Sequence, residues 1–349
     1  MTKVRLSAVR KQFGGFVAIE NIDLEVASGE LVALLGPSGC GKTKTLHMIA
    51  GLERPTMGSI LFDDQDVLEK SVQDRNVGMV FQRYALFPHM TVERNVAFGL
   101  SVRGLPRAEI AQRLEEMLEV VQLTQFRTRF PAQLSGGQMQ RVAIARTLIT
   151  KPLILMMDEP LANLDTKLRG EMRRFIRALQ QRFGITTIFV THDQVEAMEL
   201  ADRVAVIFDG RIAQYDTPEQ IYRRPTSLDV ADFMGANNIF AGRLVSPTRV
   251  ETALGPLDCT QRPGFAANDR VSAMLRSEVL IMQGGDLPAG HQGIRGKVTS
   301  REFFGAGVTY GVTCNGQEVT VTENARRMVE VGTEVWVDIS PSHVWLLRG

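Results

Sequence analysis

The chain has 349 residues, with 40 lysines and arginines against 39 aspartates and glutamates, so it has no overall basic field that would attract nucleic acid. Its three cysteines, Cys40, Cys259 and Cys314, are scattered, which argues against a disulfide framework and a zinc site and favours a reducing cytoplasm. There is no signal-peptide pattern at the N-terminus and no run of about 18 apolar residues, so we expect any membrane role to go through a partner.

The first segment predicts a pair of antiparallel strands. Residues Val4 to Phe13 and Ile22 to Val26 alternate apolar and polar side chains around a Gly14-Gly15 turn. Phe13 stands just before this turn, where an exposed ring could stack on a base. An isolated phenylalanine is more often part of a core, so both interpretations stay open at this point.

A phosphate-binding loop is predicted next. The apolar run Leu31 to Leu35 is typical of a buried parallel strand, and apolar residues at helical spacing follow the loop. Every fixed position of the pattern G-x-x-x-x-G-K-[ST] is matched by Gly36-Pro37-Ser38-Gly39-Cys40-Gly41-Lys42-Thr43. In such a loop the lysine reaches the β- and γ-phosphates and the threonine hydroxyl binds Mg²⁺. The alternative is a glycine-rich turn in an ordinary α/β protein.

Gln82 follows the next predicted strand, Val77 to Phe81. Ligands collect at the carboxyl ends of parallel strands, so Gln82 could touch Mg²⁺ or an attacking water, although it could also be a plain surface residue. The loop from Tyr84 to Met90 is rich in apolar and aromatic residues and is expected either to pack or to meet a partner.

A helical insert follows, and within it Ser135-Gly136-Gly137-Gln138 predicts an unusual helix start. Ser135 and Gln138 have the spacing of a capping box. Two glycines in the first turn weaken a helix, which indicates that something approaches this backbone closely, and helix N-termini bind anions. A helix start that merely tolerates two glycines remains the alternative.

Two further predicted strands end in residues that could take part in catalysis. Leu153 to Met157 predicts a buried strand that ends in Asp158 and Glu159, which could hold Mg²⁺ through water and orient the attacking water; ordinary turn residues are the alternative. The strand Thr187 to Thr191 ends at His192, which could contact a γ-phosphate or have no such role. Between them lies a long helix whose five arginines indicate a solvated face.

Past about residue 235 helical periodicity largely disappears. Short β-rich runs separated by glycine and polar turns predict a small barrel or sandwich domain. These runs are Arg270 to Leu275, Gly296 to Arg301, Val308 to Thr313, Glu318 to Thr322 and Glu334 to Ile339.

Taken together, residues 1–235 resemble the nucleotide-binding subunit of ATP-binding cassette (ABC) transporters. The resemblance rests on the phosphate loop, Gln82, Leu134 to Gln138, Met157 to Pro160, Leu161 to Asp165, and Thr191 to Asp193. Residues 236–349 resemble the regulatory, oligonucleotide/oligosaccharide-fold-like extension (TOBE domain) of importer ATPases. The implied fold is an α/β P-loop cassette with a helical subdomain at about 87–150, followed by a small all-β domain.

The resemblance implies a role for each motif. It implies that Phe13 stacks on adenine, that residues 36–44, including Lys44, bind ATP, and that Glu159, His192 and Lys42 are catalytic. It assigns Mg²⁺ to Thr43, Gln82 and Asp158. Residues Ser135 to Gln138 would act on ATP held by the other subunit of a head-to-tail homodimer, with Asn163, Leu164 and Asp165 in a dimer-interface loop.

One residue of this segment departs from the family's pattern. Lys44 stands where this family commonly has serine or threonine beside the α-phosphate, so a flexible cation replaces a hydroxyl there. Cys40 would be open to oxidation if the helix N-terminus lowered its pKa.

The implied function is that of the ATP-hydrolysing subunit of an importer. It would sit peripherally at the cytoplasmic face of the inner membrane, with two transmembrane permease subunits, a solute-binding protein and no nucleic acid as partners. Residues 84–92 and 233–240 look most like the polyamine (spermidine/putrescine) importers, with ferric iron, phosphonate, sulfate and sugar importers as alternatives. A cassette ATPase acting on DNA or ribosomes would show paired cassettes or a coiled-coil insertion, and a regulatory module would lack Glu159 or His192.

Overall fold

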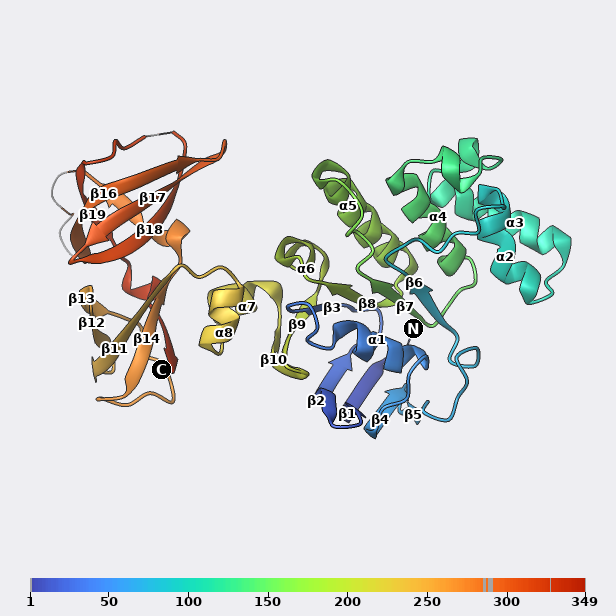
Figure 1. The fold of residues 1–349 in the computed structure, drawn as a ribbon, viewed down its shortest axis with the longest axis horizontal. Coiled ribbons are helices and arrows are strands. Elements are labelled where there is room, and N and C mark those ends of the chain that lie inside the picture. Colours follow the sequence, from blue (N-terminus) through green and yellow to red (C-terminus); the bar gives the residue numbers. More distant parts are fainter. Residues whose placement is uncertain (1, 285–286, 288–290, 327, 349) are drawn as a thin grey trace. The chain divides into compact units, whose positions relative to one another are not determined.

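The computed structural model describes residues 2–284, 287, 291–326 and 328–348. It divides into two compact units, Met1–Glu219 and Gln220–Gly349, and each is described here by itself (Figure 1).

The first unit is built on one ten-stranded sheet of order β5-β4-β1-β2-β10-β9-β3-β8-β7-β6. Its strands are β1 Val4–Phe13, β2 Phe16–Val26, β3 Leu31–Leu35, β4 Met57–Phe62, β5 Gln65–Asp66, β6 Val77–Val80, β7 Ile154–Asp158, β8 Thr186–Thr191, β9 Arg203–Phe208 and β10 Arg211–Asp216. Its helices are α1 Lys42–Ala50, α2 Val92–Val102, α3 Arg107–Val120, α4 Gly136–Leu148, α5 Thr166–Phe183 and α6 Gln194–Leu200, with short 3₁₀ turns at Thr124–Phe126 and Pro131–Gln133.

The parallel part of this sheet is buried on both faces. Strands β6, β7, β8, β3 and β9 pair in parallel. On β7, Ile154 and Met156 pack into the cluster that contains α1, whereas Leu155 and Met157 pack into the cluster of α2 to α5. A strand covered on both faces reads as a continuous apolar run, which is why these strands could be located from the sequence.

The helical insert gathers α2, α3 and α4 at one end of this unit (Figure 1). The loop before it is folded around Asn95, which is fully buried. The Asn95 side chain donates to the carbonyls of Phe87, Met90 and Thr91 and accepts from the Phe87 amide. Phe87 also packs on Phe98, with ring centroids 4.5 Å apart. The apolar loop at 84–90 is therefore ordered by the cassette itself.

The second unit consists of two five-stranded antiparallel sheets around one core, which confirms the predicted all-β domain. The first sheet has the order β13-β12-β11-β14-β20 and the second β15-β19-β16-β17-β18. Their bounds are β11 Asn238–Ser246, β12 Arg249–Thr252, β13 Gly255–Asp258, β14 Arg270–Leu275, β15 Ile281–Gln283, β16 Gly293–Phe303, β17 Gly307–Cys314, β18 Gln317–Asn324, β19 Glu334–Asp338 and β20 Trp345–Arg348, with 3₁₀ turns at Ser277–Val279 and Pro341–His343.

The division between the units falls at residues 219/220, earlier than the expected boundary at 235/236. Two short helices, α7 Pro218–Arg223 and α8 Leu228–Phe233, link the sheets. Arg276, which is buried, donates to the carbonyls of Met234 and Tyr222 at 2.8 and 2.6 Å. Trp345 donates to the Pro225 carbonyl at 2.9 Å. These bonds attach residues 222–234 to the β domain, although these residues form helices and not strands.

The sequence indicated that the arginines of α5 form a solvated face, and this holds for only some of them. Arg173 contacts Glu199 at 2.6 Å, and Arg177 contacts Asp202 at 2.5 Å. Asp202 also accepts from the Leu31 amide at 2.8 Å, so this pair fixes α5 to the start of β3. Burial opposes ionisation of Asp202, but its hydrogen bonds to Arg177 and Leu31 outweigh burial and lower its pKa.

We expect Asp202→Asn to lower the free energy of unfolding by about 1–2 kcal/mol at neutral pH, because the charge-assisted bond to Arg177 is lost. A lowered pKa contributes stability above the ordinary value near 3.8 and loses it as pH falls through the folded value, so the two proteins should converge in acid. Urea unfolding followed by far-ultraviolet circular dichroism measures this. In the control Glu199→Gln, the carboxylate that is lost is more exposed (51% against 36% for Asp202), so its loss should cost under about 0.5 kcal/mol. Equal losses in both variants would contradict the account.

Candidate functional site

The site forms where three parallel strands end side by side. The register of the sheet pairs Leu35 of β3 with Thr191 of β8, and Asp158 of β7 with Val190 of β8. The residues that follow these strand ends are the glycine-rich loop, His192 and Glu159. The sheet therefore brings the glycine-rich loop together with Glu159 and His192, which both lie more than a hundred residues after it in the sequence.

The glycine-rich loop wraps around its own lysine. Gly41 has φ +107°, and a Cβ at this position would lie 2.7 Å from the Ile19 side chain, so only glycine fits. Lys42 is 5% exposed, and its ammonium donates to the carbonyls of Gly36 and Pro37, both at 2.8 Å. An ammonium held by neutral carbonyls is placed to exchange them for phosphate oxygens.

A cavity of about 580 Å³ opens beside this loop. Phe13 lines it and is 43% exposed, so its ring is not part of the core and is available for stacking. The other lining residues are Phe16, Ala18, Ser38, Gly39, Gly41, Lys42, Thr43, Lys44 and Glu159.

Thr43 and Asp158 form an oxygen pair that can hold a hard cation. The Thr43 hydroxyl donates to Asp158 Oδ1 at 2.9 Å. Burial raises the pKa of Asp158, against the opposing effect of this hydrogen bond. A desolvated carboxylate beside a hydroxyl suits Mg²⁺, which binds few protein oxygens and keeps phosphate and water ligands. In the described part of the chain, no three acidic, histidine or cysteine residues cluster as a metal cage.

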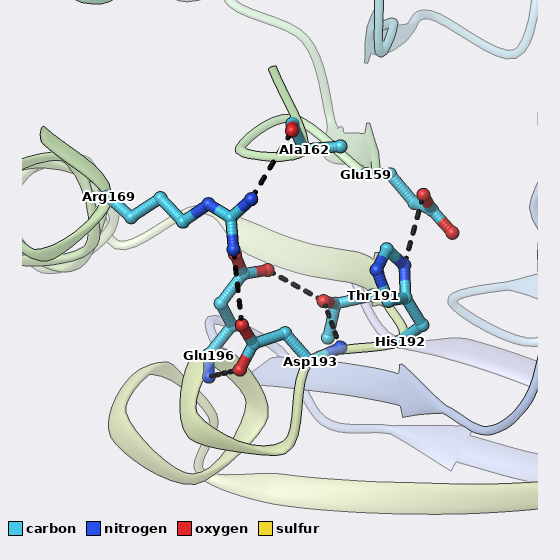
Figure 2. A pocket seen from close by; sticks show the side chains of 7 residues that line it. All are labelled: Glu159, Ala162, Arg169, Thr191, His192, Asp193 and Glu196. Carbon is cyan, nitrogen blue, oxygen red and sulfur yellow. Dashed lines mark hydrogen bonds and ion pairs between the residues drawn. The ribbon is translucent and has the colours of Figure 1, made fainter. Parts of the chain in front are cut away.

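Glu159 adopts a strained backbone conformation at the end of β7. Its φ is +43°, in the left-handed region, and its amide donates to the Val190 carbonyl at 3.0 Å. Such a conformation costs about 1–3 kcal/mol in a residue with a side chain and is typical of functional sites. It turns the carboxylate toward His192, whose Nδ1 lies 3.2 Å from Glu159 Oε2 (Figure 2).

A buried network of polar residues holds the loop that carries His192. Glu196 is 3% exposed and accepts from the Thr191 hydroxyl at 2.6 Å, and the same hydroxyl accepts from the Asp193 amide at 3.0 Å. Arg169 on α5 lies 3.6 Å from Asp193 and donates to the Ala162 carbonyl at 3.4 Å (Figure 2). The network therefore joins the loop at residues 161–165 to the loop after β8, which carries His192 and Asp193. Burial raises the pKa of Glu196.

Arg169 and Glu196 were missed by sequence reasoning. Arg169 was placed on a solvated helix face, and Glu196 reads as an ordinary acidic residue in the first turn of a helix. Their roles depend on contacts between α5, α6 and two loops, which no local pattern in the sequence reveals.

Gln82 and the loop at 163–165 lie outside the cavity lining. β6 ends at Val80, so Gln82 is exposed in the following loop, and its carbonyl accepts from Asn163 at 2.8 Å. Leu164 is buried, and Asp165 caps α5 by accepting from the Leu168 amide. The structure thus joins Gln82 to Asn163 without bringing the Gln82 side chain to the phosphate loop.

The Ser135 segment forms the expected capped helix start. Ser135 Oγ accepts from the Gln138 amide, and Gln138 Oε1 accepts from the Ser135 amide at 3.0 Å. A Cβ on Gly137 would lie 2.8 Å from the Leu168 side chain, so packing against α5 also requires this glycine. Ser135, Gly136, Gly137 and Gln138 are not among the described residues that line the cavity. One chain alone therefore does not bring this segment to its own phosphate loop.

The suggestion that Cys40 is open to oxidation is wrong. Cys40 is buried, and this burial raises its pKa despite the nearby Lys42. Cys259 and Cys314 are also buried, with raised pKa values.

We expect all three thiols of the native chain to react with Ellman's reagent at least about tenfold more slowly than a free thiol, because burial suppresses both access and thiolate formation. The unfolded chain in guanidinium provides the control, where all three should react at once. Fast reaction of Cys40 in the native chain would contradict the structure.

Comparison with known proteins identifies this arrangement. Residues 19–162 match the family model described as ABC transporter, and residues 273–347 match the TOBE domain. A protein named "Fe(3+) ions import ATP-binding protein FbpC" from Photobacterium profundum is 42% identical over 99% of this chain and 97% of its own length. The chain belongs to the ABC transporter family of ATP-binding proteins. It is an ATP-hydrolysing, importer-type subunit with a cassette and a C-terminal TOBE domain, as the motifs indicated.

Other relatives agree on the family. A protein with the same name from Rhizobium etli is 44% identical over 92% of this chain and 91% of its own length. "Sulfate/thiosulfate import ATP-binding protein CysA 2" from Rhizobium meliloti is 54% identical over 68% of this chain and 65% of its own length. Among solved structures, cbiO1 from Clostridium perfringens, part of the ABC transporter complex cbiONQ, matches with a TM-score of 0.59 and 30% identity, over 62% of this chain and 89% of that one.

Proposed function

We propose that the chain is the ATPase subunit of a ferric-iron importer and that ATP is hydrolysed at the end of β3, β7 and β8. The observation that carries the ATPase site is the meeting of the phosphate loop, Glu159 and His192 at adjacent strand ends. Phosphoryl transfer needs mainly positioned cations and a positioned water, and this edge supplies the Lys42 ammonium and a Glu159 carboxylate that would position the water.

Each residue has its own role in the proposed hydrolysis, which its position in the site determines. Lys42 exchanges the carbonyls of Gly36 and Pro37 for the terminal phosphates, and Phe13 stacks on the adenine. Glu159 accepts the proton of the attacking water, and its strained backbone holds the carboxylate in place. His192 is 53% exposed, so it has room to contact the γ-phosphate while it orients Glu159.

Mg²⁺ belongs to the proposal as the ion that neutralises charge on the β- and γ-phosphates. Thr43 and Asp158 would hold it directly or through water, and Gln82 would reach it only after its loop moves. The raised pKa of Asp158 supports this assignment, because a buried carboxylate without a cation is destabilised.

The proposed working unit is a head-to-tail homodimer. The Ser135 helix start is a preorganised anion site, yet it lies away from the cavity of its own chain. A second copy would supply it to the γ-phosphate, so two ATP molecules would lie between two chains. The loop at 163–165 lies beside Gln82 and would transmit this closure.

The proposed role in solute import implies the remaining partners. None of the helices in the described part of the chain combines the length and apolar character needed to cross a bilayer. We infer two separate permease subunits, a solute-binding protein, and a peripheral location at the cytoplasmic face of the inner membrane. The loop around Phe87, which Asn95 holds in place, would dock a permease.

Ferric iron is now ranked above the polyamines that the sequence pattern favoured. The relatives that align along almost the whole chain, TOBE domain included, carry the Fe(3+) name. The sulfate/thiosulfate relatives are more identical but align over only about two thirds of the chain. Sulfate is therefore the second candidate.

We expect Glu159→Gln to lower the rate of ATP hydrolysis at least about 100-fold while ATP binding persists, because only proton acceptance is lost. The variant should accumulate as an ATP-bound dimer in size-exclusion chromatography. The control Glu171→Gln alters an exposed glutamate on α5 and should hydrolyse normally. Near-normal turnover of Glu159→Gln would overturn the assignment.

We expect deletion of the gene to abolish uptake of radiolabelled ferric iron in iron-starved cells, and the native chain but not Glu159→Gln to restore it. Uptake of labelled sulfate and spermidine measured in parallel is the control and should not change. Loss of sulfate or spermidine uptake with intact iron uptake would assign the importer to that solute instead.

A further inference from the structure

Another, much smaller cavity borders Glu159 and His192 (Figure 2). Its volume is about 10 Å³, which is about the room that one water molecule needs. A cavity of this size stays dry when its walls are apolar and holds a water when they offer two to four polar partners. These walls are mostly polar, since the other lining residues are Ala162, Arg169, Thr191, Asp193 and Glu196.

The Arg169 guanidinium has one nitrogen left to bond such a water. Its Nε donates to the Leu164 carbonyl at 3.0 Å, and its Nη2 donates to the Ala162 carbonyl at 3.4 Å. Its Nη1 lies 3.6 Å from Asp193 Oδ2, which is too far for a direct hydrogen bond and leaves room for a bridging water. Asp193 Oδ1 is already used, because it accepts from two backbone amides at the start of α6. Nη1 and Oδ2 are therefore a donor and an acceptor that one water can join.

Glu196 supplies a second acceptor for this water. It is 3% exposed, so solvent stabilises its charge poorly, and burial raises its pKa. The Thr191 hydroxyl donates to Glu196 Oε2 at 2.6 Å, whereas none of the described residues donates to Oε1. A buried carboxylate oxygen without a donor is costly. One water in the cavity removes this cost if it accepts from Arg169 and donates to both Asp193 and Glu196.

We propose that this cavity binds one ordered water, which accepts from Arg169 and donates to Asp193 and Glu196. The three residues act as positioning residues: they join the loop at residues 161–165, which Arg169 holds, to the loop after β8, and so keep His192 beside Glu159. None of the three is among the described residues that line the cavity beside the phosphate loop. This catalytic role rests on the proposed ATPase function, whereas the water site does not.

A crystal structure of the full chain at about 1.8 Å resolution or better tests the water site directly. One density peak should lie within about 2.5–3.2 Å of Arg169 Nη1, Asp193 Oδ2 and Glu196 Oε1. The inference is overturned if the cavity shows no peak, or if Arg169 contacts either carboxylate directly in its place. This measurement does not depend on hydrolysis. A native chain that hydrolyses no ATP would remove the proposed function and leave the water site to be decided by the density.

Steady-state ATP hydrolysis by two variants of Glu196 tests the positioning role. Glu196→Gln can accept from Thr191 and donate to the water, so its kcat should stay within about threefold of the native value. Glu196→Leu has a similar volume but can bond neither, so its kcat should fall at least about 30-fold. KM for ATP should change less than about threefold in both variants, because the phosphate loop and Phe13 are untouched. Thr191→Val, which lacks the hydroxyl that holds Glu196, should lower kcat about tenfold, whereas Thr191→Ser should not.

Glu199→Leu is the matched control for these variants. It removes an exposed carboxylate from the same helix, α6, at a position that is not among the described residues lining the small cavity, and it should hydrolyse ATP at the native rate. The positioning role is contradicted by native kcat in both Glu196→Leu and Thr191→Val. It is equally contradicted by the same loss of kcat in Glu196→Gln as in Glu196→Leu, because then the conservative variant does not rescue.

Discussion

The register of strand β8 between β3 and β7 is the constraint on which the site depends. Because these strands run parallel and end together, the loop after β3, Glu159 after β7 and His192 after β8 must meet at one edge. Apolar side chains packed on both faces of the sheet fix this register. A slip of one residue would turn these buried side chains to the wrong faces and separate the loop, Glu159 and His192.

Strain and buried polar bonds then set the fine geometry at that edge. The left-handed backbone of Glu159 is maintained by its bond to Val190, and the carboxylate of Glu196 fixes the loop below His192. Arg169 connects this loop to the segment at 161–165, and Asn163 connects that segment to the loop of Gln82. A nucleotide that moves one of these loops therefore acts on the others through direct contacts.

The sequence predicted what depends on local pattern and could not predict what depends on packing. Buried strands and the phosphate loop were located because apolar runs and glycine spacing are local signals. Arg169 was assigned to a solvated face, since its partners lie on loops that come close only in the fold. The division at residues 219/220 was missed for the same reason, because Arg276 and Trp345 attach helical segments to a β domain. Burial likewise reversed the expectation for Cys40.

The central claim is that each ATP site is completed by a second chain, and heterodimers with two different affinity tags test it most directly. In one heterodimer, one chain carries Lys42→Ala and the other Ser135→Arg, so one composite site keeps both native segments. In the matched heterodimer, one chain carries both substitutions and its partner none, so neither composite site is intact. The account predicts ATP hydrolysis by the first heterodimer and almost none by the second. Activity in the second heterodimer only would show that Ser135 acts on the ATP of its own chain and would contradict the account.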